Sequence, residues 1–194
     1  PKLGSIFGLA IFSRIFDHEC QQLATVIQAM RMMAPGLAPA EGDFPAQGQE
    51  ALLDDIDMLL HRHHQVILAG GGIMMAGASP ELLKLAEKTD IPVTTTMPAL
   101  ATFPRNHRLS IGMLGMHGTV YANCAVRDCD LLLAIGTRFS DRVVGNVSQF
   151  AKGAYIVHVD IDFSELGKVK KPHLPITADA RLFLAALNKK LASY

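Results

Sequence analysis

IGMLGMHGTVYANCAVRDCDLLLAIGTRFSDR, which occupies residues 111–142, is the stretch that decides the fold. Its glycines at 112, 115 and 118 permit a positive φ or a close approach of the backbone to a ligand. Thr119 is a suitable N-cap for a helix running through Asp128, and the apolar run Leu131–Ile135 is typical of a strand covered on both faces. The predicted inner face of that helix consists of Val120, Ala122, Ala125 and Val126.

The loop after this strand, GTRFSDR at Gly136–Arg142, is the first candidate site. In open α/β sheets, ligands bind beyond the carboxyl ends of the strands. Arg138, Asp141 and Arg142 bring two guanidinium groups and a carboxylate to that position. Guanidinium groups pair well with phosphate oxygens, so the loop suggests a ligand that carries a phosphate or a nucleotide.

Further strands are expected at 66–69, 91–96 and 155–162, with an edge strand at 174–177. Gly70–Gly72 come directly after the first of these, where a tight turn or a ligand contact would need glycine. Helical patterns separate most of these strands from one another. The alternation predicts an α/β fold of three layers, in which a largely parallel, Rossmann-like sheet carries helices on both faces.

Several helix ends are also predicted. Ser79 is expected to cap one helix, with Pro80 at its first position, and Asp179 is expected to cap the last helix. The inner face of that last helix should consist of Leu182, Phe183, Leu184, Leu187 and Leu191. His61-Arg62-His63-His64 is expected in the last turn of an earlier helix, where basic side chains suit the helix dipole, so we expect no metal site there.

Composition limits the function classes. The chain has 194 residues, of which 49% are hydrophobic and 19% charged, and its formal net charge is zero. These values indicate a folded, well-buried domain and exclude the strongly basic field of a nucleic-acid-binding protein. We expect residues 1–47 to form an N-terminal arm and linker, and residues 48–194 to form one nucleotide-binding domain. The arm either meets another domain or subunit or folds as a helix onto its own core.

The chain's cysteines, Cys20, Cys124 and Cys129, contain no CxxC pair and are odd in number. Free thiols in a reducing compartment are therefore expected, and the cytoplasm is the default. Leu3–Phe16 is apolar, but Arg14 interrupts it and it is too short to span a bilayer. We expect neither a membrane nor a nucleic acid as a partner.

Several motifs occur in a characteristic order: AGGG, IPVTTT, MLGMHGTVYAN, GTRFSDRVVG, HVDID, ELGK and KPHLPITAD, which begin at residues 69, 91, 113, 136, 158, 165 and 171. From about Val66 to Leu191 the chain resembles the central domain of the large, catalytic subunit of acetolactate synthases (acetohydroxyacid synthases). That family depends on thiamine diphosphate and carries FAD that takes no redox part in the main reaction. The resemblance therefore implies an FAD-contacting domain.

The resemblance also implies site residues. Contacts with the flavin nucleotide would come from Gly71, Thr96 and Met97. The isoalloxazine side would be lined by Leu114, Gly115, Met116 and His117. The diphosphate and ribityl region would meet Gly136, Thr137, Arg138, Phe139 and Ser140. The adenosine end would be held by Asp160, Ile161, Asp179 and Ala180. Arg142 would lie near the substrate channel, Lys2 would be a weak match to a channel residue, and no catalytic residue would belong to this chain.

For the whole enzyme, the resemblance implies decarboxylation of pyruvate and its condensation with a second 2-oxo acid, a step of branched-chain amino-acid biosynthesis. Thiamine diphosphate and Mg²⁺ would be held by other domains of the same polypeptide, so the isolated chain should be inactive. A homo-oligomer, a dimer or a tetramer, and a small regulatory subunit are the implied partners. The alternative is a stand-alone nucleotide-binding or regulatory module without catalysis.

The chain departs from the family pattern in two places. Ala99 and Ala101 stand where the family has glycines, so a loop that needs a positive φ at either position would have to change shape. Ser140 stands where the family has a carboxylate near the ribityl chain.

Overall fold

The computed structural model describes residues 49–60 and 64–191. The predicted arm and linker, 1–47, and with it Lys2, Cys20 and Leu3–Phe16, lie outside the described residues, as do His61, Arg62 and His63. In the part of the chain that is described, no helix is both long enough and apolar enough to cross a bilayer.

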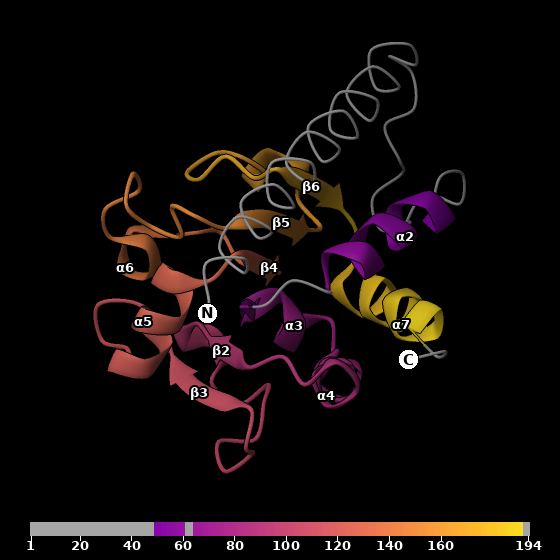
Figure 1. Cartoon of the computed structure of the whole chain (residues 1–194), viewed down its shortest axis with the longest axis horizontal. Coiled ribbons are helices and arrows are strands. Elements are labelled where there is room, and N and C mark those ends of the chain that lie inside the picture. Colours follow the sequence, from indigo (N-terminus) through magenta and orange to yellow (C-terminus); the bar gives the residue numbers. More distant parts are fainter. Residues whose placement is uncertain (1–48, 61–63, 192–194) are drawn as a thin grey trace, which may run out of the picture. The chain divides into compact units, whose positions relative to one another are not determined.

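A six-stranded sheet, parallel throughout, forms the middle layer (Figure 1). Its strands are β1 (Gln65–Ala69), β2 (Val93–Thr95), β3 (Ser110–Met113), β4 (Leu131–Ile135), β5 (Tyr155–Asp160) and β6 (Leu174–Thr177). They are arranged in the order β3-β2-β1-β4-β5-β6, which is the order of doubly wound dinucleotide-binding folds. The predicted fold class is confirmed, and β6 lies at the sheet edge as expected.

Helices cover both faces of the sheet. They are α2 (Gln49–Leu59), α3 (Gly71–Met75), α4 (Ser79–Thr89), α5 (Val120–Asp128), α6 (Asp141–Val144) and α7 (Ala180–Lys190), with short 3-10 turns η1 (Met97–Ala99) and η2 (Phe163–Glu165). Figure 1 shows α2, α4 and α7 gathered on one side of the sheet and α5 and α6 on the other, and α7 contacts both α2 and α4. The sheet is therefore the covered middle of three layers.

A buried cluster beneath α5 and α6 shows why this strand pattern folds as it does. Leu68, Leu132 and Ile156, from three adjacent strands, pack against Val126 of α5 and Val144 of α6. All residues of β4 are buried, which confirms the prediction of a strand covered on both faces. Such a strand needs no polar alternation, because no side of it meets water.

Two of the predicted helix caps are confirmed. The Thr119 hydroxyl accepts a hydrogen bond from the Ala122 N–H, and the Asp179 carboxylate accepts from the N–H groups of Arg181 and Leu182. The predicted cap at Ser79 is wrong. Helix α4 begins at Ser79 itself, and its N-cap is Ala78, which offers no side-chain acceptor.

Three other local predictions are corrected. Helix α2 ends at Leu59, so His64 lies beyond it, next to β1, and is not in a last helical turn. Val120 and Leu182 were expected to face inward, but they are 74% and 49% exposed. In α5 the buried positions are Ala122 and Val126, one turn apart. Val120 lies two positions before Ala122 and therefore points to the opposite side of the helix. In α7 the face through Ala180, Phe183, Leu184 and Leu187 leaves Leu182 outside it.

Candidate functional site

The candidate site lies at the carboxyl edge of the sheet, where β1 and β4 are neighbours. Strand order reverses here, because the connection from β1 leads toward β2 and the connection from β4 leads toward β5. The loops that leave two such strands diverge, and ligands bind in the opening between them in this class of fold. The loops after β1 and β4 are therefore the first places to look for binding groups.

These two loops are joined backbone to backbone. The Gly70 N–H donates to the Ile135 carbonyl at 2.8 Å, and the Gly72 N–H donates to the Gly136 carbonyl at 3.0 Å. Gly136 has a φ of 62°, and a Cβ on Gly72 would lie 2.7 Å from the Gly136 Cα. Glycine at 70, 72 and 136 is thus required by the packing of the loops, whatever ligand binds there.

Gly71, the glycine implied to contact a cofactor, has different surroundings. The atom nearest to a Cβ added at this position is the Pro98 Cβ, at 3.2 Å. Gly71 opens α3 and lies beside η1, which contacts α3. The Thr96 side chain is buried, and its N–H donates to the Ala69 carbonyl, whereas Met97 is 60% exposed. Gly71 and Met97 therefore lie at neighbouring loop positions at this edge.

A second junction connects the loop after β3 to α6. The Met116 N–H donates to the Arg142 carbonyl at 2.9 Å, and the Arg142 Nη1 lies 3.7 Å from the Met116 Sδ. Gly115 has a φ of 106°, and a Cβ there would overlap the Arg142 carbonyl oxygen. Met116, His117 and Arg142 have exposed side chains, while the Leu114 side chain is part of the buried cluster. Leu114 can therefore offer a ligand only its backbone.

The loop after β4 alternates buried and exposed side chains. Thr137 and Phe139 are buried, while Arg138 and Ser140 are exposed. Phe139 has a φ of 49°, a left-handed conformation that is uncommon outside glycine. Its ring packs edge-on against Phe150, with 5.8 Å between ring centroids. Burial of the ring holds this unusual backbone in place.

Backbone donors of this loop are unused. Within the described residues, the N–H groups of Thr137, Arg138, Phe139 and Ser140 have no hydrogen-bond acceptor. Successive free N–H groups in a loop form a favourable environment for an anion, and the Arg138 guanidinium adds a full positive charge beside them. The donor set therefore suits a phosphate or diphosphate group.

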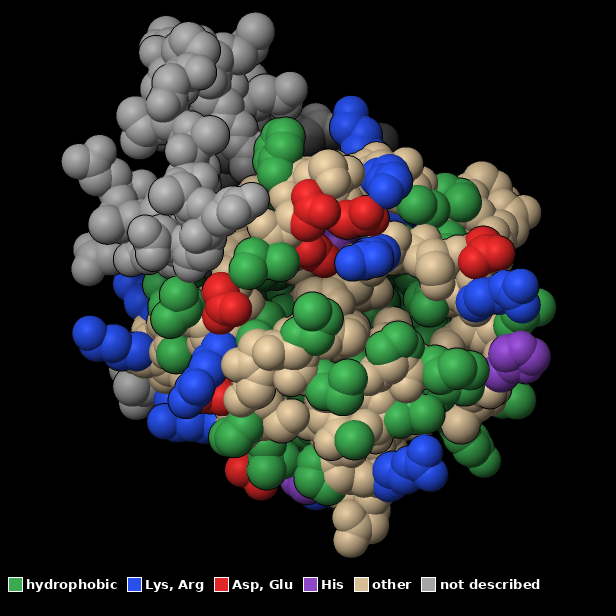
Figure 2. All heavy atoms as spheres, turned by 180° about the vertical axis from the view of Figure 1, so that it is seen from behind, with side chains coloured by type: hydrophobic (Ala, Val, Ile, Leu, Met, Phe, Trp, Pro, Cys, Tyr) green, Lys and Arg blue, Asp and Glu red, His purple; other side chains and the backbone are tan. Residues whose placement is uncertain are grey.

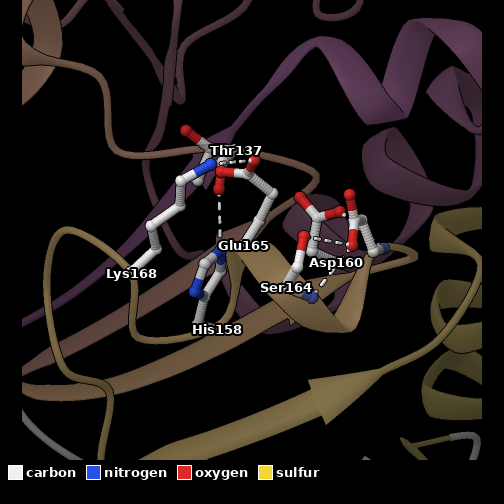
Figure 3. A network of polar contacts seen from close by, with 7 residues as sticks. Thr137, His158, Asp160, Ser164, Glu165 and Lys168 are labelled. Atoms are coloured by element: carbon white, nitrogen blue, oxygen red, sulfur yellow. Dashed lines mark hydrogen bonds and ion pairs between the residues drawn. The ribbon is translucent and has the colours of Figure 1, made fainter.

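Acidic side chains lie at the carboxyl end of β5 and just beyond it (Figure 3). Asp160 is 8% exposed, its Oδ1 accepts from the Asp162 N–H at 3.0 Å, and burial raises the pKa of its carboxyl. Asp162 accepts from both the N–H and the hydroxyl of Ser164, and these hydrogen bonds lower the pKa of the Asp162 carboxyl. Lys168 pairs with Glu165 at 2.8 Å. Asp160 thus offers a carboxylate acceptor at the end of the strand. The positive charge of Arg138 favours the ionised form of this carboxyl and so acts against the effect of burial on its pKa.

The remaining implied residues fall at the ends of β5 and β6. Ile161, directly after Asp160, is 56% exposed. Asp179 is half-buried, and its Oδ1 is engaged as the cap of α7; Ala180 is buried behind it. Asp179 therefore has a structural role that does not depend on any ligand.

Exposed hydrophobic side chains surround this edge. Met75, Met97, Met116 and Phe163 follow the carboxyl ends of β1, β2, β3 and β5 and are each more than half exposed. Figure 2 shows one face of the molecule on which hydrophobic side chains lie among polar ones, with acidic and basic groups close together in one area. Apolar side chains at the same edge of the sheet as the free N–H groups suit a ligand that has both a flat ring and phosphates.

The alanines that replace glycines in the loop after β2 fit without strain. Ala99 is the last residue of η1 and is buried, and Ala101 is exposed just beyond it. Neither residue has a positive φ. The loop therefore adopts a conformation that alanine tolerates.

Comparison with known proteins decides the family. The model of a family described as "Thiamine pyrophosphate enzyme, central domain" matches residues 54–187. The chain belongs to this family. Within it, the chain is similar to acetolactate synthases, which confirms the resemblance stated from the motifs.

Three relatives of this thiamine pyrophosphate enzyme central domain illustrate the similarity. A probable acetolactate synthase large subunit of Methanocaldococcus jannaschii is 47% identical over 79% of this chain and 25% of its own length. A probable acetolactate synthase 2, chloroplastic, of Oryza sativa subsp. japonica is 48% identical over 88% of this chain and 25% of its own. The acetolactate synthase large subunit of Corynebacterium glutamicum is 46% identical over 79% and 24%. The chain spans about a quarter of the length of these relatives.

Sequence reasoning missed two features of this thiamine pyrophosphate enzyme central domain. The free N–H groups at 137–140 cannot be inferred from the residue types, since every non-proline residue has a backbone N–H group. His158, in the middle of β5, had no role assigned to it, although a histidine within an apolar strand was a visible signal. Among residues 49–60 and 64–191, no cluster of three or more His, Cys, Asp or Glu side chains is arranged to hold a metal ion.

Proposed function

We propose that this chain is the FAD-contacting central domain of a thiamine-diphosphate-dependent acetolactate synthase. The intact enzyme decarboxylates pyruvate and condenses the product with a second 2-oxo acid, in branched-chain amino-acid biosynthesis. The observation that supports this best is the run of free N–H groups at 137–140 beside Arg138, at the point where the strand order reverses. Such a donor set suits the diphosphate of a dinucleotide.

The other groups at this edge suit the rest of FAD. The Asp160 carboxylate is an acceptor of the kind that binds ribose hydroxyls, and Asp160 is the last residue of β5, the strand next to β4. Met97 and Met116 present flexible apolar side chains of the kind that pack against flat rings. Arg142, which contacts Met116 and has an exposed side chain, then lies on the ring side, and we assign it to the substrate channel.

The residues proposed to contact FAD fall into four sets. The diphosphate and ribityl part meets Gly136, Thr137, Arg138, Phe139 and Ser140. The flavin nucleotide is contacted by Gly71, Thr96 and Met97. The isoalloxazine side is lined by Leu114, Gly115, Met116 and His117. The adenosine end is held by Asp160, Ile161, Asp179 and Ala180. Leu114, whose side chain is buried, would contribute through its backbone.

Thiamine diphosphate and Mg²⁺ are proposed to bind to flanking domains of the same polypeptide. The isolated chain is then inactive, and its partners are those domains, a second copy of the subunit and a small regulatory subunit. We place the enzyme in the cytoplasm, which suits the free thiol of buried Cys129.

Titration of the purified chain with FAD, followed by flavin fluorescence, tests the cofactor assignment. We expect weak, saturable binding that is lost in Arg138→Ala, because the guanidinium and the loop N–H groups act on the same diphosphate. Arg108→Ala is the matched control. Arg108 is also exposed, but it pairs with Asp90, and these two residues precede β3 and β2, at the amino edge of the sheet, opposite to the candidate site. Equal loss in both variants, or binding unaffected by Arg138→Ala, would contradict the assignment.

A chimera tests the activity. Residues 66–191 would replace the corresponding segment of the Methanocaldococcus jannaschii relative, and acetolactate formation from pyruvate would be measured. We expect formation of acetolactate by the chimera and none by the isolated chain. A folded chimera that binds thiamine diphosphate but stays inactive would instead favour a nucleotide-binding module without catalysis.

A further inference from the structure

His158 is a fully buried histidine in the middle of β5, and the proposed function gives it no part. Its Nε2 lies 2.7 Å from the backbone oxygen of Thr137. Figure 3 marks this contact with a dashed line. Its ring packs edge-on against the Phe139 ring, with 4.6 Å between centroids. One side chain thus contacts two residues of the loop that carries the free N–H groups.

The protonation state of His158 follows from its partners. A carbonyl oxygen only accepts hydrogen bonds, so Nε2 must carry a proton. Nδ1 is buried, and it has no partner within the described residues. A second proton there would create a buried charge with an unused donor, which is costly, so the neutral form protonated at Nε2 is favoured. Desolvation by burial is the largest influence on the pKa of His158 and lowers it, although the hydrogen bond to Thr137 and the carboxylates of Asp160 and Glu165 act in the opposite direction.

The hydrogen bond also orients the peptide unit between Thr137 and Arg138. The peptide group is planar and trans, so its C=O and N–H point in opposite directions. Because the Thr137 carbonyl points to His158, the Arg138 N–H points away from it. The contact with Phe139 supports the next residue, whose φ of 49° would not persist without its surroundings.

We propose that His158 is a positioning residue for the anion-binding loop 137–140: its neutral imidazole, protonated at Nε2, anchors the Thr137 carbonyl and thereby presents the Arg138 N–H to a phosphate oxygen. This inference rests on the proposed function, since it identifies what holds the diphosphate-binding loop in shape. His158 itself touches no ligand. Its effect on binding is transmitted through the Thr137–Arg138 peptide and the Phe139 ring.

Two variants separate the hydrogen bond from packing. His158→Gln keeps an N–H donor at about the position of Nε2, whereas His158→Leu fills space without a donor. We expect His158→Gln to bind FAD within about threefold of the unaltered chain and His158→Leu to bind roughly tenfold more weakly, in keeping with the loss of one buried hydrogen bond. Val157→Ala is the control for general destabilisation, because Val157 is the neighbouring buried residue on the opposite face of β5. It should leave FAD affinity unchanged.

A second measurement requires no variant. Long-range proton–nitrogen NMR spectra of the chain with labelled histidine should show His158 protonated at Nε2 and unprotonated at Nδ1 at neutral pH. A proton on Nδ1, or equal affinities of the Gln and Leu variants when both are folded, would overturn the positioning role. If His158→Leu does not fold, the tautomer of His158 and the FAD affinity of His158→Gln test the positioning role. Failure of the unaltered chain to bind FAD would overturn the proposed function, and the tautomer would then test the anchoring of the loop by itself.

Discussion

Gly70 and Gly136 lie backbone against backbone where the loops after β1 and β4 meet. A Cβ added to Gly70 would overlap the carbonyl oxygen of Gly136, and its next nearest atoms also belong to the backbone of 136 and 137. Backbone atoms held by hydrogen bonds on both sides have little room to move. Glycine at position 70 is therefore required for the two loops to pack together, and this requirement exists before any ligand binds.

Gly70→Ala should lower the free energy of unfolding by about 2 kcal/mol or more, because the methyl group forces the two loops apart. Urea unfolding followed by circular dichroism measures this change. Gly153→Ala is the control, since a Cβ there meets nothing within 4 Å and its φ is not positive. The explanation fails if the two variants are equally stable.

Thr119→Val should lower the free energy of unfolding by about 1 kcal/mol, the usual effect of losing an N-cap. The hydroxyl accepts from the Ala122 N–H at 3.2 Å and donates to the Ile111 carbonyl at 2.7 Å, and valine replaces neither bond. Ser79→Ala is the matched control, with an expected change within about 0.5 kcal/mol, because Ser79 does not cap α4. Chemical denaturation of both variants checks the contrast.

Cys129 should resist alkylation in the folded chain. It is 3% exposed, and burial raises the pKa of its thiol to about 12, so very little reactive thiolate is present at mildly alkaline pH. Mass spectrometry after iodoacetamide treatment should find Cys129 unmodified until denaturant is added, while half-buried Cys124 provides an internal comparison. Rapid modification of Cys129 under native conditions would disagree with its burial.

Stability should decline as the pH falls below the ordinary histidine pKa of 6.5. Burial lowers the pKa of His158, so in this range the unfolded chain binds a proton that the folded chain does not, and acid favours unfolding. In His158→Gln this part of the pH dependence should be flatter. Denaturation midpoints measured over a pH series test the slope, and an unchanged slope in the variant would be the opposite result.

Asp160 should act with the opposite sign at lower pH. Burial raises the pKa of its carboxyl above the ordinary 3.8, so the folded chain binds the proton more tightly than the unfolded chain does. The protonated Asp160 carboxyl therefore contributes stability to the folded chain. This contribution is fully present below pH 3.8 and is lost as the pH rises through the raised pKa. Asp160→Asn should remove this loss, making the variant less dependent on pH in that range. The same pH series measures it.

Sequence patterns predict most of the sheet because strands buried on both faces leave long apolar runs, as in Leu131–Ile135. β3 was missed because it has no such apolar run. Its residues, Ser110–Met113, are all half-buried at the sheet edge, and Gly112 interrupts the run. The short helices α3 and α6 were also missed, since helices of five and four residues leave no periodicity to detect.

Sequence patterns indicate which residues of the candidate site lie near strand ends, but not how the loops that carry them are held. Arg138 and Asp160 stand at strand ends that the alternation of elements makes visible. The left-handed φ of Phe139 and the contact between His158 and the Thr137 carbonyl depend on which strands become neighbours. Strand order is a long-range property, and local patterns carry little information about it.

The pairing of β1 with β4 has a consequence for how the chain folds. Ile67 and Leu133 are partners across these strands, although roughly a third of the chain separates them. Closing so long a loop is slow compared with forming the local β1–β2 and β4–β5 units, so this pairing should be among the last to form. The β1–β2 and β4–β5 units would then form before β1 pairs with β4. A dinucleotide that binds where β1 and β4 meet would therefore bind only to the fully folded domain.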